Sequence, residues 1–560
     1  MTNVNDPSWA VNDLADRFWE GVLELNPSIA TTYGDERYAD RLEDPSPEGR
    51  ARTRRLMLRT LDELAATTPD ELPVEDRITR DMLRVVGELA IEEDDQKIYE
   101  LRVVDQMAGP QTLLPQLALF QPVDTPERVD KFLARIAAYP AFMAANAGIL
   151  REGLADGLTA PRIVAERTVA QLERLLAVPV DESPIPTAVQ VTNEADRDRV
   201  RAAVRDHVYT ADAAFLNVLR NEYLPQTREE PGLWSAPNGD ALYRTQIRSW
   251  TTLDLDPAEV HQIGLDDIDE IDAERLEIAS AAGFDSVTSY REALTADPAN
   301  IPTSRDALVE RATEDIDRAL AVASRYFGRL PKADCQVRPV EEYKERDAPF
   351  AYYFPPAVDG SRPGTYYVNA YDLGSRTYTK LASTTYHEAV PGHHFQIALE
   401  MENPNLNTFR RLGSRMVGGA YVEGWGLYSE RLADEMGLFR TEAERFGMLD
   451  AMAWRAARLV VDTGIHALRW SRQRSIDFLL ETGLSATDAT IETDRYIAWP
   501  GQALTYKIGQ REIERLRGEL AARDGSRFDL RAFHDAVLGH GSLPLATLAS
   551  ELPNWLATPA

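Results

Sequence analysis

Apolar residues recur at helical spacing along most of the chain. In the first 25 residues they lie three or four positions apart and would line one face of a helix: Val11, Leu14, Phe18, Val22 and Leu25. The preceding pair Asp6-Pro7 is typical of a helix start, because aspartate caps free backbone N–H groups and proline fits the first turn. Similar starts recur at Thr125-Pro126 and Asp256-Pro257. The pattern predicts a mainly α-helical protein.

One stretch departs from the helical pattern. Residues 350–354 and 365–369 are rich in aromatic and β-branched side chains, and Asp359-Gly360 lies between them. Two such segments around a turn sequence predict a small antiparallel β-hairpin.

The length and the distribution of proline and glycine bear on domain organisation. A chain of 560 residues exceeds the usual size of one hydrophobic core, so two lobes are expected. Proline and glycine cluster at 226–240, which is the best internal boundary. We therefore predict an N-terminal helical lobe at 1–230 and a second helical region at 231–560, intertwined as one structural unit.

The charge balance narrows the range of partners. The chain has 61 Lys and Arg against 91 Asp and Glu, a net charge of −30, and 44% of its residues are hydrophobic. The apolar content excludes a disordered or fibrous chain. An acidic surface repels phosphate backbones and anionic lipids, so neither a nucleic-acid partner nor a membrane partner is expected.

The first residues and the cysteine content predict a location. The first twenty residues have no basic segment followed by an apolar one, and no run of 18 apolar residues occurs. The single cysteine, Cys335, excludes an intrachain disulfide and fits a reducing compartment. These features predict a soluble cytoplasmic protein.

Three of the eight histidines lie within eight residues, in the sequence YHEAVPGHHFQ. They are His387, His393 and His394, and Glu388 follows the first. The arrangement is similar to the HExxH helix of zinc peptidases, in which two imidazoles one turn apart bind Zn²⁺ and the glutamate activates water. It differs at the fourth position after His387, where Pro391 cannot bind a metal.

This difference requires a distorted helix. In a straight helix His393 would lie about 9 Å along the axis from His387 and off its face, and His394 about 10.5 Å along it. Pro391 lacks an N–H and clashes with the preceding turn, while Gly392 tolerates unusual dihedral angles. A two-residue bulge could thus bring His393 back towards His387, with His394 as the alternative. The alternative interpretation is a kinked helix of the hydrophobic core. In that case the clustering of Glu388 with three histidines would be a coincidence.

A zinc site of this kind needs a third protein ligand. Glu423 in YVEGWGLYSE lies 36 residues after His387, far enough for a turn and an antiparallel helix. Glu430 is seven residues later on the same face, as an alternative ligand or as a partner that orients an imidazole. Gly424 and Gly426 would let this helix approach the first one closely.

Several motifs resemble those of a large bacterial family described as a domain of unknown function. They are HEAVPGHHFQ, VEGWGLYSE and WPGQALTYKIGQ, with further similarity at 232–243, 461–470 and 533–545. That family is similar to zincin-like metallopeptidases whose third ligand is glutamate. The resemblance implies a mainly α, two-lobed zincin-like fold with a deep cleft. It also implies a short sheet, here the hairpin, whose edge strand holds an extended peptide.

The resemblance also implies roles for the site residues. Related helical peptidases carry HExxGH, with glycine before the ligand, which favours His393 together with His387 and Glu423 as ligands of one Zn²⁺. Glu388 would be the general base. Tyr506 lies 118 residues after Glu388, a separation similar to that of catalytic tyrosines in such enzymes, and would stabilise the oxyanion.

Further residues complete the predicted substrate site. Lys507 could pair with a substrate carboxylate. Tyr496 and His466 are reserve candidates for the oxyanion donor. Tyr367 and Asn369, in the hairpin, are expected to contact the bound peptide.

Together these inferences predict a zinc-dependent peptidase acting on short peptides, as an oligopeptidase or a carboxypeptidase-like enzyme. A deep cleft would exclude folded proteins. One alternative is a zinc amidohydrolase for a non-peptide amide. Another is a catalytically inactive helical binding protein of the same fold, against which the intact Glu388 argues.

Overall fold

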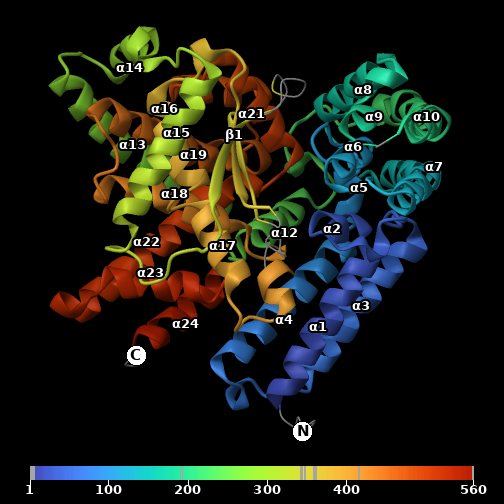
Figure 1. The fold of residues 1–560 in the computed structure, drawn as a ribbon, viewed down its shortest axis with the longest axis horizontal. Helices are drawn as coiled ribbons and strands as arrows, with labels where there is room; N and C mark the ends of the chain where they lie inside the picture. Colours follow the sequence, from blue (N-terminus) through green and yellow to red (C-terminus); the bar gives the residue numbers. More distant parts are fainter. Residues whose placement is uncertain are drawn as a thin grey trace. The chain divides into compact units, whose positions relative to one another are not determined.

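α-Helices make up most of the chain in the computed structural model (Figure 1). The structure describes residues 7–189, 191, 193–340, 345, 349–356, 362–413 and 416–557. The prediction of a mainly helical protein is confirmed.

The chain divides into two units. Unit 1 comprises Met1–Thr245, Ile465–Arg472 and Asp494–Pro500, and unit 2 comprises Gln246–Gly464, Gln473–Thr493 and Gly501–Ala560. The main division thus falls at residue 245, and two short later segments belong with the N-terminal part.

Unit 1 consists of helices and short turns. Its helices are α1 Pro7–Leu25, α2 Pro27–Thr32, α3 Pro47–Ala65, α4 Val74–Asp95, α5 Ile98–Arg102, α6 Pro110–Phe120, α7 Pro126–Asp156, α8 Arg162–Ala177, α9 Pro184–Ala188, α10 Glu194–Ala203, α11 Thr210–Val218 and most of α12 Gly239–Thr251. The predicted helix starts at Pro7 and Pro126 are observed, and Thr125 accepts a hydrogen bond from the N–H of Arg128. Most of the predicted apolar face of α1 is buried.

Helix α7 is long and apolar enough to cross a membrane by length and composition alone, the only such helix in the described part of the chain. Its middle carries Arg135, which is fully buried. The Arg135 guanidinium donates hydrogen bonds to the side chains of Thr31 and Gln121 and to the carbonyl of Tyr38. These bonds are typical of a core helix in a folded unit.

Unit 2 carries the remaining helices and the sheet. The helices are α13 Pro257–Ala281, α14 Val287–Ala296, α15 Arg305–Ala323, α16 Tyr378–Glu388, α17 His393–Glu402, α18 Gly419–Glu435, α19 Glu442–His466, α20 Arg472–Glu481, α21 Ala486–Ala498, α22 Thr505–Asp524, α23 Leu530–Gly539 and α24 Leu545–Ala557; the last residues of α19 and α21 and the first of α20 belong to unit 1. The predicted start of α13 is observed, with Asp256 capping the N–H of Ala258.

The sheet has three described strands: β1 Cys335–Pro339, β2 Ala351–Phe354 and β3 Gly364–Val368, in the order β1-β3-β2. The predicted hairpin is observed as the antiparallel pair β2–β3, and its turn at Asp359-Gly360 lies outside the described residues. Strand β1 pairs parallel to β3. It was not predicted, because the strand has only five residues, is partly polar and ends in proline. The sheet packs against α15, α16 and α17 (Figure 1).

Candidate metal centre

The histidine motif spans a break between two helices. Helix α16 ends at Glu388 and α17 begins at His393. Ala389, between them, has φ −110° and ψ −100°, outside the helical region. A Cβ atom on Gly392 would collide with the carbonyl oxygen of His387, so only glycine fits there. The distortion expected around Pro391 is therefore a complete interruption of the helix.

Helix α18 holds this break in place. The Pro391 carbonyl accepts hydrogen bonds from Trp425 Nε1 at 2.9 Å and from Ser429 Oγ at 3.2 Å. Both donors are buried. The carbonyl left without a helical partner by the break is thus satisfied, as a buried backbone group requires.

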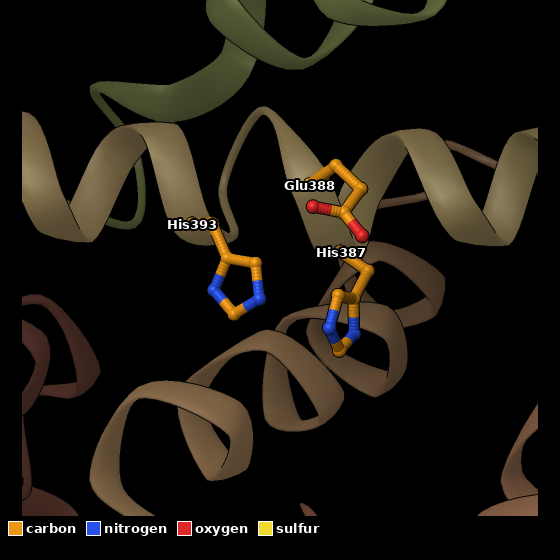
Figure 2. A group of neighbouring side chains, drawn as sticks. All are labelled: His387, Glu388 and His393. Atoms are coloured by element: carbon orange, nitrogen blue, oxygen red, sulfur yellow. The ribbon is translucent and has the colours of Figure 1, made fainter. Parts of the chain in front are cut away.

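The break brings three polar side chains together (Figure 2). His387 and Glu388 come from the last turn of α16, and His393 is the first residue of α17. One possible ligand atom from each lies within 4.8 Å of the others. The two imidazole rings are 4.6 Å apart between centroids and stand at 81°.

Glu423, from α18, completes this group. Its Oε2 atom lies 3.5 Å from His387 Nε2 and 3.5 Å from His393 Nε2. Tetrahedral Zn²⁺ with ligand bonds of about 2.0–2.1 Å places donor atoms about 3.3 Å apart. Both separations from Glu423 Oε2 are therefore close to those expected for donors around a single zinc ion.

Glu430 supports the site from behind His387. Its Oε1 atom is 2.8 Å from His387 Nδ1, and its other oxygen accepts a hydrogen bond from Ser383 Oγ. A carboxylate on the second ring nitrogen fixes the tautomer that leaves Nε2 free for a metal. Of the two predicted roles for Glu430, the structure favours that of an orienting partner.

The electrostatics of the group favour a cation. Burial alone would lower the pKa of His387, but hydrogen bonds to Glu423 and Glu430 raise that pKa to about 10. Burial would raise the pKa of Glu423, but the imidazoles of His387 and His393 hold it well below its usual range. The carboxylates of Glu423 and Glu430 thus stabilise positive charge on the imidazoles.

A glycine of α18 makes room beneath the two rings. A Cβ atom on Gly426 would lie 2.8 Å from His387 Nε2 and 3.0 Å from His393 Cε1. Gly424 instead faces α22, where its Cβ would collide with Gly509. The expectation that both glycines face the first helix is corrected: each accommodates a different neighbour.

The second neighbouring histidine, His394, points away from this group. Its Nδ1 is 2.9 Å from the Tyr353 hydroxyl and its Nε2 is 3.1 Å from the Ala333 carbonyl oxygen. Burial lowers its pKa to about 4. With both ring nitrogens engaged, His394 connects β2 to the segment before β1 and is not placed as a ligand.

Tyr506 lies beside the ligands. Its ring stacks on that of His387 with centroids 6.4 Å apart and planes at 25°. The guanidinium of Arg458 lies 4.2 Å from the centre of the Tyr506 ring. Tyr506 thus lies next to the first predicted ligand, and its role as an oxyanion donor stays a prediction.

The reserve candidates do not join the group. His466 and Tyr496 belong to segments of unit 1, and both are fully buried there. His466 Nε2 is 2.9 Å from the Tyr496 carbonyl oxygen, and His466 Nδ1 accepts the N–H of Leu233 at 3.2 Å. Both ring nitrogens are thus occupied by backbone groups, which is a structural role.

Two of the predicted substrate contacts are also corrected. Lys507 is 4% exposed, donates to Gln510 Oε1 at 3.0 Å and lies 3.5 Å from Asp267 Oδ2, so it is not available to a substrate. Asn369 is buried and donates to the carbonyls of Glu345 and Pro349, which ties down the segment before β2. These contacts depend on packing between distant segments, which residue spacing does not report.

Tyr367, the remaining predicted contact, lies in the sheet. Its ring stacks on that of Tyr352 on the neighbouring strand, with centroids 4.9 Å apart. It therefore sits on one face of the sheet, within the hairpin as predicted.

A cavity of about 270 Å³ adjoins the ligands. His393 and Glu423 line it together with Trp250, Tyr353, Pro355 and Gln502. Trp250 and Gln502 were not among the predicted site residues, although Gln502 lies in the WPGQ motif. A space of this size beside the donors can take a side chain and part of a peptide backbone.

Comparisons with known proteins place the chain in a family. The family model described as "Bacterial protein of unknown function (DUF885)" matches residues 27–552. The sequence matches no curated protein.

Two solved structures have similar folds. One is "the putative lipoprotein from Colwellia psychrerythraea", 28% identical, with a TM-score of 0.92 over 99% of this chain and 100% of that chain. The other is "a putative lipoprotein of unknown function from Shewanella oneidensis", 19% identical, with a TM-score of 0.76 over 96% of this chain and 99% of that one. The second likeness concerns the fold alone.

These descriptions overturn the prediction of a cytoplasmic location. Both similar structures are of proteins described as lipoproteins, and a lipoprotein is held at a membrane by its covalent lipid. The prediction rested on the composition of the first residues, the lack of an 18-residue apolar run and the single cysteine. One cysteine forms no intrachain disulfide in a reducing or in an oxidising compartment, so the cysteine content does not decide between them.

Proposed function

The chain belongs to the DUF885 family of bacterial proteins of unknown function, and we propose that it is a zinc-dependent metallopeptidase that hydrolyses short peptides. The observation that carries the proposal is the convergence of His387 Nε2, His393 Nε2 and Glu423 Oε2 at separations that suit one zinc ion. Glu388 lies beside them, where a general base is needed.

The metal would be held by His387, His393 and Glu423, with Glu430 orienting the first imidazole. The space under the rings at Gly426 and the carboxylates around His387 support this assignment. A bound Zn²⁺ would polarise the substrate carbonyl and lower the pKa of a water molecule.

Glu388 would act as general base and then as general acid. Its side chain is partly exposed and lies near both imidazoles, and Glu423 already supplies a third donor beside His387 and His393. It would take a proton from the attacking water and deliver it to the leaving amine. Tyr506, beside His387, would donate its hydroxyl proton to the oxyanion in a hydrogen bond.

The edge of the sheet supports a peptide as the substrate. β2 is an edge strand in the order β1-β3-β2, and Tyr353 and Pro355 at its end line the cavity beside His393. An extended peptide can pair with such an edge through backbone hydrogen bonds. The helical frame, the small sheet and the glutamate ligand fit the zincin-like fold that we propose for this chain.

The proposed location rests on the Colwellia relative, which has the higher sequence identity of the two. The Colwellia protein, described as a lipoprotein, is 28% identical across 99% of this chain. We infer that this chain also works at a membrane or outside the cytoplasm, on peptides available there.

The test combines metal analysis with a peptide library. After zinc reconstitution and dialysis, we expect one zinc per chain and mass-spectrometric detection of cleaved peptides. Glu388→Gln should retain the zinc and lose turnover by about 10²-fold or more, which is the usual contribution of a general base. Glu310→Gln, an exposed change on α15, is the matched control and should behave as wild type.

The outcomes separate the rival functions. A protein that remains free of zinc after reconstitution would overturn the proposal in favour of a binding protein. A zinc protein that cleaves small acylated amines and no peptide would instead be an amidohydrolase. Near-normal activity of Glu388→Gln would remove Glu388 as the base.

A further inference from the structure

Three cationic side chains gather two helical turns before the candidate ligands. We call Arg376, Lys380 and Arg455 the basic cluster. Lys380 Nζ lies 4.7 Å and Arg376 Cζ 5.2 Å from the centre of the ring of Phe350, which directly precedes β2. Lys380 is seven residues before His387 on α16, which places it on the same face about 10.5 Å along the axis.

Arg455, on α19, acts on Lys380 through its charge and also contacts the site of the candidate ligands. One terminal nitrogen is 3.7 Å from Glu430 Oε1, the carboxylate that orients His387. Its Nε atom is buried and has no hydrogen-bond partner among the described residues. A buried guanidinium nitrogen without an acceptor is unfavourable, so an acceptor from a ligand would stabilise it.

The cationic groups of Lys380 and Arg376 have carboxylates nearby but none in direct contact. Asp488 and Glu492 attract Lys380, and Asp488, Asp372 and Glu345 attract Arg376, but within the described residues no carboxylate comes within ion-pair distance of either group. Glu492 is 3.1 Å from Arg458 instead. In a chain of net charge −30, where carboxylates are in excess, such a cluster indicates an anionic ligand.

The direction of β2 identifies the end of the peptide that would arrive there. β2 runs from Phe350, at the basic cluster, to Tyr353 and Pro355, at the cavity beside His393. An added strand pairs most stably when antiparallel. Its amino end would then lie at the cavity and its carboxyl end at the basic cluster.

We propose that the basic cluster binds the terminal carboxylate of the substrate, so that the enzyme is a carboxypeptidase. This deepens the proposed peptidase function and rests on it. The distance of about 10.5 Å corresponds to about three residues of strand, so the released fragment is one to three residues long. In the reaction the amide C–N bond breaks, the water oxygen bonds to the carbonyl carbon, and both water protons end on the products.

The experiment compares peptides that differ only at the C-terminus. The zinc-loaded enzyme is given N-acetylated peptides of one sequence as free acids or as C-terminal amides, and the products are identified by mass spectrometry. We expect kcat/KM for the acid to exceed that for the amide by about 10²-fold, with release of short C-terminal fragments. Equal cleavage of both forms, or cleavage far from the C-terminus, overturns the carboxypeptidase inference and leaves the peptidase function standing.

Variants at Lys380 then test whether the preference for a free C-terminal carboxylate depends on the basic cluster. Lys380→Ala should reduce the acid-to-amide ratio by at least tenfold, mainly through KM, while Lys380→Arg should retain most of it. Lys332→Ala, an exposed lysine of the same unit, is the matched control and should leave the ratio unchanged. An unchanged ratio in Lys380→Ala would remove the basic cluster as the carboxylate site.

A binding measurement keeps the inference testable without turnover. Zinc-loaded Glu388→Gln is titrated with the same acid and amide peptides by calorimetry. Binding of the acid at least tenfold tighter than the amide, with the difference lost when Lys380→Ala is added, supports the inference even if no peptide is cleaved. Equal affinity for the two forms contradicts it.

Discussion

Adjacent histidines at the start of α17 have opposite environments. His393 faces His387 and Glu423, whereas His394 bonds Tyr353 and the Ala333 carbonyl. Neighbouring residues of a helix point about 100° apart, so one of them can face the metal only if the other does not. The break before His393 decides which one does.

This difference gives the first prediction. His393→Ala should lose stoichiometric zinc, because it removes one of three ligands. Its zinc affinity should fall by more than the 10- to 100-fold that is typical when a residue orienting a ligand is removed. His394→Ala should retain zinc. Both variants are dialysed side by side and their zinc is measured by elemental analysis, with circular dichroism to check folding. An empty His394→Ala beside a loaded His393→Ala would reverse the ligand assignment.

Tyr506 gives a second prediction at this scale. Tyr506→Phe removes one hydroxyl donor and should lower kcat by about 10²-fold, equivalent to about 3 kcal/mol in the barrier, with zinc content and KM little changed. Tyr371→Phe, a change at an exposed tyrosine, serves as the control. If only KM rises in Tyr506→Phe, the hydroxyl contacts the substrate without stabilising the transition state.

At the scale of elements, α18 organises the centre. It supplies Glu423 and Glu430, and its Trp425 and Ser429 hold the Pro391 carbonyl in the break. One helix thus positions a ligand, an orienting carboxylate and the loop between the other two ligands. Gly426 allows it to lie directly under the imidazoles.

The third prediction tests this close approach. In Gly426→Ala the added methyl would lie 2.7–2.8 Å from His387 ring atoms, closer than contact distance. Displacement of the rings should weaken zinc binding by about tenfold or more, and overpacking should destabilise unit 2 by about 1–3 kcal/mol. Zinc affinity is measured by competition with a chelator, and stability by thermal unfolding.

Gly518→Ala on α22 is the matched control. A Cβ atom there meets nothing within 4 Å, and the position is exposed and helical. The change should leave zinc affinity unchanged and stabilise the helix by about 0.5–1 kcal/mol. Equal zinc affinity in the two variants would contradict the proposed role of Gly426.

At the scale of the whole molecule, a buried carboxyl in unit 1 links stability to pH. Asp212 is 5% exposed and accepts a hydrogen bond of 2.8 Å from the Tyr139 hydroxyl. Burial raises its pKa to about 7, although the bond from Tyr139 opposes this rise. Between the ordinary carboxyl pKa and about 7 the native state therefore holds a proton that the unfolded chain has released, and native stability falls as the pH rises through this range.

The fourth prediction follows from this fall in stability with rising pH. Asp212→Asn keeps a neutral acceptor for Tyr139, so its stability relative to wild type should rise by about 2 kcal/mol between pH 5.5 and pH 8.5, because about 1.5 pH units of this range lie below the folded pKa of about 7. Thermal unfolding at the two pH values measures the difference. Asp62→Asn, at an exposed position of the same unit, should show no such gain. A difference that does not vary with pH would mean that Asp212 is already ionised at pH 5.5.

The sequence by itself determined the local features of this protein. Apolar spacing and capping pairs predicted the helices, and the aromatic segments around 359–360 predicted the β2–β3 hairpin. The spacing of His387, Glu388 and Glu423, with a proline and glycine in between, predicted a group that the structure brings together. These features depend on a few neighbouring residues or on one helix–turn–helix connection, so a linear pattern contains them.

Only the tertiary structure decided the features that depend on distant segments. Lys507 and Asn369 carry suitable chemistry, but Asp267 and the segment before β2 occupy them. The grouping of Lys380 with Arg455, and the cavity lined by Trp250, join residues far apart in the chain. Which face of a helix is covered, and by what, is set by packing between elements, and residue spacing along the chain does not specify that packing.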